Sequence, residues 1–521
     1  MGTNYSKSIM KHVEELTVEN ERLTADNKRL RAENGELRLR INRLEKTMES
    51  RIEAAVASAV QRAKVPILAE LAVKEEKIVK LEAEIGRLRA QIDKTSGNLS
   101  KPPSQDGFRK IPNSREKSER KSGGQAGHLG RCMALPENLD ELVEKGLARI
   151  ETVDHTGGSD TYVTRHTVDI DFTIVVTEHR YAVGQVPPNH RVPVIYGDKI
   201  KALVCLLSVE GFVAMDRISN LISEITSGAI SLSEASIEKF MADISDKLDG
   251  ELEVIETDLL NGHVMNVDEA PMDVAQKSDY SSDTPEMRKL EGTSFTAYIR
   301  THSNERSTLY TVNPQKDAAG CERDGILPQY MGIISQDHEA KFYKYGTGHA
   351  TCGAHLLREL KGMFELLKIP WAEEMRRFFA NINRYKNNDL EAGRTECDPE
   401  ALVCFEKEYD RLLSAGHTAL AQLKEKELGQ LGLRRMISRL TDYKDCYLLF
   451  VRDYRVPFTN NLAERDLRPD KTKQKVSGCF RSWNGLQNFA RIRSFFSTVT
   501  KRSGNLLFSI SSVLNSIPVL R

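Results

Sequence analysis

The sequence lacks paired cysteines: its 8 cysteines are scattered along 521 residues, and none forms a Cys-x-x-Cys motif. Scattered thiols supply neither a disulfide framework nor a paired-cysteine zinc site. The sequence also lacks an apolar run close to the roughly 20 residues that span a bilayer, and it begins without the apolar core of a signal peptide. We therefore expect a cytoplasmic protein with no membrane partner.

The sequence has no net charge, because 75 Lys and Arg side chains balance 75 Asp and Glu side chains. This balance argues against a uniformly basic nucleic-acid-binding protein, but it allows basic segments that acidic segments cancel. Residues 101–131 have a net charge of +5, residues 464–502 of +7 and residues 243–273 of −9. The chain is thus divided into segments of opposite charge, and its length allows several domains.

Leucine recurs at every seventh position from Leu16 to Leu44, and asparagine stands four positions after each of the first three leucines. A seam of this kind over about five heptads is typical of a coiled coil, in which paired asparagines favour two parallel strands. A long amphipathic helix packed on its own globular domain is the alternative. Pro66 interrupts the helix, because proline lacks the N–H that the helix needs. We predict a parallel coiled coil, or leucine zipper, over residues 1–95, broken near Pro66, that makes the chain a homodimer or higher multimer.

Residues 96–131 are rich in proline, serine, glycine and charge and poor in apolar residues. This composition is typical of a linker or of a segment that becomes ordered on binding. Its basic side chains, among them Arg109, Lys110 and Lys121, either contact phosphates or belong to a solvated tether.

Period-two alternation places Val168, Ile170, Phe172, Ile174 and Val176 on one side of an extended segment and predicts a half-buried strand within residues 160–180. Over residues 196–260 the apolar spacing is helical. The pattern then changes again. Residues 263–274, 294–301, 307–312 and 332–336 each predict a strand, and about 110 mostly helical residues follow.

Three carboxylates stand out in this part of the chain. Asp268 lies in the first predicted strand, Asp337 directly follows the fourth, and Glu464 opens a helix after the helical region. A ribonuclease-H-like core has this order of elements: a first strand with one acid, two more strands, a fourth strand with the second acid, and a later helix with the third. Three converging carboxylates would hold two Mg²⁺ ions, since Mg²⁺ prefers oxygen ligands, and such an ion pair promotes displacement at a phosphoryl group.

Basic side chains follow Glu464. The candidates for phosphate contacts are Arg465, Arg468, Lys471, Lys473, Lys475 and Arg481. Phe480 and Trp483 are interleaved, and such aromatic rings can stack on bases; a solvated helix face is the alternative interpretation. Cys352 and His355 are spaced to share one helix face. They either support a metal site or form a buried cysteine beside a hydrogen-bonded histidine.

Several stretches resemble the transposases of the bacterial insertion sequence 66 family. They are SKPPSQDGFRK (100–110), GGQAGHLG (123–130), PVIYGDKIKALVCLLSVEGF (193–212), NVDEAPMDV (266–274), CGAHLLRELKGMF (352–364), NNLAERDLRP (460–469) and KQKVSGCFRSWNGLQNFARIRS (473–494). The resemblance implies a DDE transposase of an insertion sequence, whose catalytic and metal-binding triad is Asp268, Asp337 and Glu464. It also implies supporting roles for Glu269, Cys352, His355 and Asn461.

The resemblance further implies two divalent ions, Mg²⁺ or Mn²⁺ in its place, and DNA as the partner. The DNA would comprise terminal inverted repeats and target DNA, bound in part through Arg109, Lys110 and Lys121, in the bacterial cytoplasm and at the nucleoid. Accessory proteins of the same element are further expected partners. Two protomers would hold two DNA ends, and the predicted coiled coil provides the means.

The chain departs from the family pattern at three places. Residues 132–195 lack the paired cysteines of the family's zinc-binding module, so we expect a degenerate zinc-finger-like β module without zinc. Alanine follows the first acidic pair as Ala270, where the family has threonine, and His338 replaces the glycine after the second aspartate. These changes leave two alternatives open: a catalytically inactive relic that binds DNA, and a coiled-coil scaffold with an unrelated α/β domain.

The expected architecture is multidomain. It comprises a coiled coil (1–95), a basic linker (96–131), the degenerate module (132–195), a helical segment (196–260), an α/β ribonuclease-H-like catalytic domain (261–507) with an all-helical insertion at about 356–455, and a C-terminal tail (508–521).

Overall fold

The computed structural model describes residues 135–520, apart from residues 145, 147, 156–159, 162, 191, 276–279, 283 and 423–429, together with isolated positions between 22 and 77. Apart from those positions, the predicted coiled coil and basic linker lie outside the described residues, as do Arg109, Lys110 and Lys121. Within the described part, no helix combines the length and apolar character that crossing a membrane requires.

Internal contacts divide the chain into two units. The sheet unit comprises Pro112–Thr351 and Thr459–Arg521, and the helical unit comprises Cys352–Phe458 with Met1–Ile111. The two units are described separately.

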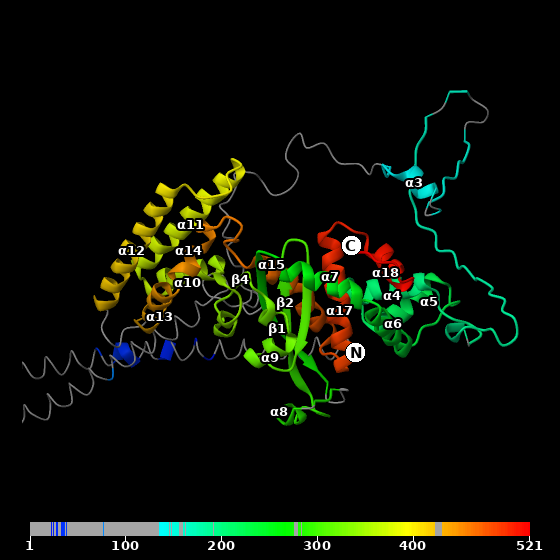
Figure 1. Ribbon diagram of the computed structural model, residues 1–521, viewed down its shortest axis with the longest axis horizontal. Helices are drawn as coiled ribbons and strands as arrows, with labels where there is room; N and C mark the ends of the chain where they lie inside the picture. The colour runs from blue at the N-terminus through cyan, green and yellow to red at the C-terminus, as the bar shows by residue number, and fades with distance from the viewer. Residues whose placement is uncertain are drawn as a thin grey trace, which may run out of the picture. The chain divides into compact units, whose positions relative to one another are not determined.

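The sheet unit is built on five strands (Figure 1). They are β1 (Val264–Val274), β2 (Phe295–Ser303), β3 (Thr308–Asn313), β4 (Ile333–Gln336) and β5 (Gly348–Thr351), in the spatial order β3-β2-β1-β4-β5. β2 is antiparallel to β1 and β3, whereas β4 is parallel to β1 and β5. This mixed sheet fits a ribonuclease-H-like core. Four of its strands were predicted, and β5 was missed because its four residues show no apolar alternation.

The described helices of this unit precede, separate or follow the strands along the chain. They are α3 (Leu139–Glu144), α4 (Asp198–Val209), α5 (Met215–Ile225), α6 (Glu234–Asp246), α7 (Asp249–Leu260), α8 (Pro285–Arg288), α9 (Ala318–Asp324), α15 (Asn461–Asp466), α16 (Arg468–Ser477), α17 (Trp483–Lys501) and α18 (Leu506–Leu514), with short 3-10 turns η2 (Pro188–His190), η3 (Leu327–Gln329) and η4 (Ala340–Lys344). Ser482 begins α17, because its hydroxyl accepts a hydrogen bond from the Gly485 N–H.

β1 separates two apolar cores. Met265 and Val267 belong to a larger core that includes side chains of α4, α6, α7, α17 and α18. Ala270 and Met272 belong to a smaller core with Leu467 and side chains of α17. A strand buried on both faces has a nearly continuous apolar sequence, which is why the acidic pair in the middle of β1 is unusual.

α17 also protects the edge of the sheet. β3 is an edge strand, and its outward N–H groups would otherwise lack partners. The Tyr310 N–H donates to the Ser494 hydroxyl at 2.8 Å, and the Thr308 N–H donates to the Thr498 hydroxyl at 3.0 Å. Small hydroxyl side chains in a buried helix therefore replace a sixth strand.

The helical unit contains α10 (Gly353–Leu367), α11 (Pro370–Glu391), α12 (Pro399–Gln422), α13 (Gln430–Asp442) and α14 (Lys444–Arg452). Proline begins both α11 and α12, as expected where a helix N–H needs no partner. Trp371 on α11 donates its indole N–H to the Leu412 carbonyl of α12 at 2.6 Å. A Cβ at Gly416 would lie 2.7 Å from the Trp371 ring, so glycine permits this close helix packing.

The strand predicted within residues 160–180 is wrong. The described residues of this segment form no strand, and the five alternating side chains are exposed, from 45% at Ile174 to 88% at Val176. Alternation produces a half-buried strand only where a neighbouring strand completes the hydrogen bonds and a core covers one face. The described residues supply neither beside this segment.

Candidate active site

The sheet places Asp268 and Asp337 side by side. β1 and β4 are parallel, and Asn266 on β1 pairs with Ser335 on β4. Asp268 and Asp337 each follow this pair by two residues, so they lie at the same level of the sheet, Asp268 within β1 and Asp337 directly after β4. Asp268 is half-buried, on the same face of β1 as Ala270 of the smaller core.

The pKa of Asp268 records its surroundings. Burial, together with the charges of Asp337 and Glu464, raises this pKa to about 7. The charge of Lys471 opposes the rise, as does a hydrogen bond of 2.8 Å from the Glu269 N–H to the Asp268 carboxylate. Asp268 therefore lies within electrostatic reach of both other predicted catalytic acids, although the three come from β1, the end of β4 and α15.

Asp337 and Glu464 also lie close to each other, with one carboxylate oxygen of each within 4.8 Å of the other. Two oxygens on one Mg²⁺ are at most about 4 Å apart, since each bond is about 2.1 Å long. A small side-chain rotation would thus let both bind the same ion. The carboxylate oxygens of Asp337 and Glu464 suit a hard divalent cation.

Asn460 holds the Asp337 carboxylate, although the sequence had pointed to Asn461. Asn460 is completely buried, and its side-chain amide donates to the Val267 carbonyl at 2.9 Å and to the Asp337 carboxylate at 3.3 Å. It also precedes α15, which carries Glu464. Asn461, the predicted supporting residue, is exposed. The preference of asparagine for helix starts could have identified Asn460.

The turn after Asp337 explains one departure from the family pattern. His338 has a φ of 68°, in the left-handed region that favours glycine. Its ring nitrogen Nδ1 lies 2.8 Å from the Tyr343 hydroxyl, at hydrogen-bond distance. The histidine thus occupies a position where the backbone suits glycine, and a side-chain contact offsets the strain.

Cys352 and His355 belong to the helical unit. Cys352 precedes α10, directly after the last residue of β5, and is buried. His355 lies in the first turn of α10 and is half-buried. The Cys352 sulfur and a His355 ring nitrogen lie within 4.8 Å of each other. Their spacing therefore does bring two potential metal ligands onto one side of the helix.

The predicted basic residues divide into exposed and buried groups. Arg465, Arg468, Lys471 and Lys475 are exposed along α15 and α16. Lys473, in contrast, is buried, where its ammonium donates to the Ser208 carbonyl at 3.3 Å. Burial lowers the pKa of Lys473 to about 8. Lys473 is therefore withdrawn from the phosphate-contacting set, because the helix turns it inwards.

Other basic residues of this stretch pair with acids of the preceding helices. Arg481 contacts Glu234 of α6, and Arg491 contacts Asp249 of α7. Arg493, which is buried, contacts Glu210 after α4. Part of the positive charge of this stretch is thus used in ion pairs between α17, or the segment before it, and the acidic side chains of α6, α7 and the end of α4.

The two interleaved aromatic residues are packed. Phe480 lies 5.4 Å from Phe489 between ring centroids, and Trp483 lies 5.2 Å from Tyr280 and 6.0 Å from Phe295. Both residues therefore contribute to packing within the sheet unit.

Residues 193–488 match the family model described as Transposase IS66 family, a span of more than half of the chain. The chain belongs to this family. Residues 56–133 match a second model, that of a family of unknown function, DUF6444. Neither the curated proteins nor the solved structures provided a match.

The family assignment identifies the chain as a transposase, which in general is an enzyme that cuts and joins DNA in transposition and recombination. The matched span contains all five strands, Asp268, Asp337 and Glu464, and also Cys352 and His355. Transposases with an acidic triad generally use divalent metals. Among the described residues, Asp337 and Glu464 of the sheet unit are candidate metal ligands, and so are Cys352 and His355 of the helical unit.

Proposed function

We propose that the chain is a DDE transposase in which Asp268, Asp337 and Glu464 bind two divalent ions, Mg²⁺ or Mn²⁺. The observation that carries this proposal is the pKa of Asp268, which burial and the charges of both Asp337 and Glu464 raise. Acids drawn together without matching cations are typical of functional sites. The proximity of the Asp337 and Glu464 oxygens supports the same site.

The chemistry follows from these side chains. Two ions bound here would activate a water or a 3′-hydroxyl and neutralise the leaving oxygen of an in-line displacement. Asp268 must lose its proton for full binding, because its pKa is near 7. Asn460 holds the Asp337 carboxylate in place. Lys471, whose charge reaches Asp268, would contact the DNA phosphate beside the reacting bond.

The exposed residues Arg465, Arg468, Lys471 and Lys475 form what we term the basic stripe of α15 and α16. We propose that it contacts the backbone of the terminal inverted repeats and the target DNA. Arg481 remains largely exposed beside Glu234 and extends the stripe. Arg109, Lys110 and Lys121 would add contacts from the basic linker, and a coiled-coil multimer, with accessory proteins of the element, would bring two ends together.

The test uses a donor plasmid with a resistance marker between the two DNA ends that flank the coding sequence. Strand transfer into a target plasmid is measured for the wild type, Asp268→Ala and Glu464→Ala. Asp216→Ala, which removes an exposed acid on α5, is the matched control. We expect transfer from the wild type and the control only. Transfer that survives Asp268→Ala would overturn the catalytic assignment, and wild-type binding to the ends without cleavage would favour the inactive relic.

A further inference from the structure

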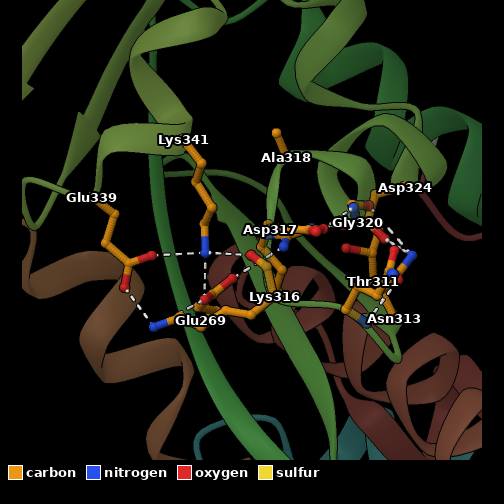
Figure 2. A network of polar contacts seen from close by, with 12 residues as sticks. Glu269, Thr311, Asn313, Lys316, Asp317, Ala318, Gly320, Asp324, Glu339 and Lys341 are labelled. Atoms are coloured by element: carbon orange, nitrogen blue, oxygen red, sulfur yellow. Dashed lines mark hydrogen bonds and ion pairs between the residues drawn. The ribbon is translucent and has the colours of Figure 1, made fainter.

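A second group of charges lies on the other face of β1. Successive side chains of a strand point to opposite faces, so Glu269 points away from the face that carries Asp268. Glu269 pairs directly across the sheet with Arg300 of β2, and their side chains lie 3.1 Å apart. The Lys341 ammonium contacts the same carboxylate, and the Lys316 ammonium lies 3.5 Å from it (Figure 2).

The charges of this group are matched. Arg300 also contacts Asp324 at the end of α9, and Glu339 lies 2.7 Å from Lys341 and 3.0 Å from Lys316. The Glu269, Arg300 and Asp324 side chains are at most 3% exposed. Buried charges are tolerated only when they are paired. We call these three acids and three bases, the residues named in this and the preceding paragraph, the Glu269 network.

The Glu269 network holds the segment that carries Asp337. Lys341 lies four residues after Asp337 and donates to both Glu269 and the Lys316 carbonyl, the latter at 2.8 Å. Glu339, two residues after Asp337, donates its N–H to the Gln336 side chain at 2.6 Å. The contact between Gln336 and Glu339 thus spans Asp337, and the contact of Lys341 ends on Glu269, the residue next to Asp268.

We propose that Glu269 and Lys341 are a positioning pair, which sets the separation of the Asp268 and Asp337 carboxylates and thereby the affinity for divalent ions. This inference rests on the proposed metal site. Outer contacts that orient ligands of this kind change metal affinity by about 10–100-fold when they are lost. Glu269 is the residue next to Asp268, and Lys341 lies four residues after Asp337. A change in the contact between Glu269 and Lys341 would therefore reach both ligands through the backbone.

The experiment measures Mn²⁺ binding to the full chain without DNA, by the loss of the free-ion signal in electron paramagnetic resonance. Lys341→Met is expected to weaken binding about tenfold, and Lys341→Arg to restore most of the affinity. Arg323→Met removes an exposed charge from the same unit and is expected to leave the affinity within about twofold. Glu269→Gln combined with Lys341→Met should weaken binding less than the sum of the two single effects, since partners in contact are non-additive.

The outcomes separate this inference from the proposed function. Wild-type binding that Asp268→Asn removes, together with unchanged affinity in both Lys341→Met and Glu269→Gln, would overturn the positioning pair alone. A lower melting temperature with unchanged Mn²⁺ affinity would also overturn it, because the pair would then be purely structural. If Lys341→Met does not fold, the Glu269→Gln and Lys341→Arg affinities decide. Wild-type protein that binds no Mn²⁺ would overturn both proposals.

Discussion

Asp268 and Glu269 are consecutive acids of one strand with opposite surroundings. Glu269 is enclosed by Arg300, Lys341 and Lys316. Asp268 faces two further acids, the Lys471 charge and the Glu269 N–H compensate them in part, and its pKa rises to about 7. Like charges are costly to gather in a half-buried site unless something neutralises them. Neighbouring bases of the fold therefore balance the charge of Glu269, whereas a bound cation would balance the charge of Asp268.

The largest expected effect is the loss of DNA cleavage on changing the unmatched acids. Asp268→Asn and Glu464→Gln should each lower the rate of DNA strand cleavage by about 10³-fold or more, because a metal ligand supports several kcal/mol of transition-state stabilisation. Glu269→Gln at saturating Mn²⁺ should cost less than about tenfold. Cleavage of a labelled terminal-repeat duplex, followed over time, measures all three. Equal losses at positions 268 and 269 would remove the distinction between them.

The next effect is the pH dependence of metal binding. Below its raised pKa of about 7, Asp268 holds a proton that a metal must displace. Mn²⁺ affinity should therefore fall as pH falls through 7, by up to about tenfold per unit. Lys471→Met should move this fall to higher pH, because the Lys471 charge lowers the pKa of Asp268. Titrations from pH 5.5 to 8 measure the dependence, and pH-independent affinity would contradict the raised pKa.

A smaller effect concerns the basic side chains after Glu464, some of which are exposed and some buried. Arg468→Ala in the basic stripe should weaken DNA binding and reduce the slope of log affinity against log salt by about 1. Lys473→Met should leave that slope unchanged, because Lys473 is buried against the Ser208 carbonyl. Fluorescence anisotropy at several salt concentrations measures both slopes. A lower slope for Lys473→Met would mean that this side chain reaches DNA.

The last effect concerns the free energy of unfolding and depends on a buried acid, Asp470. Asp470 is completely buried, neither of its oxygens has a hydrogen-bond partner among the described residues, and its pKa rises to about 8, mainly through burial. Asp466, one turn earlier, instead accepts hydrogen bonds from Ser303, Thr308 and Lys501.

The raised pKa of Asp470 has a definite sign for stability. The folded chain keeps the Asp470 proton up to about pH 8, whereas an unfolded aspartate loses it near pH 4. The free energy of unfolding should thus fall as pH rises between these values, by about 1.4 kcal/mol per unit at most. Asp470→Asn should flatten this fall in urea titrations at pH 5 and 7.5. An identical pH slope in the variant would show that Asp470 is ionised in the folded chain.

Sequence patterns predicted the features that depend on local regularity. Four strands followed from apolar runs, and so did the positions of Asp268 within the first strand, Asp337 after the fourth and Glu464 in a later helix. The family resemblance supplied the residue roles, and the family assignment is now established over residues 193–488.

The features that the sequence did not predict depend on contacts between distant segments. Asn460 acts through Val267 and Asp337, which lie 193 and 123 residues away. Lys341 reaches Glu269 across 72 residues. The direction in which Lys473 points depends on how α16 packs, which amino-acid composition does not predict. The exposed alternation within residues 160–180 shows the converse limit, since a period-two pattern alone does not supply a neighbouring strand.

The central claim is that three acids from separate elements form one metal-binding site. Its most direct test is the number of Mn²⁺ ions that the full chain binds at pH 7.5, compared between the wild type, Asp268→Asn, Asp337→Asn and Glu464→Gln. The account predicts two ions for the wild type and the loss of at least one ion from each variant, with all four proteins folded. Equal binding by the wild type and the three variants would contradict it.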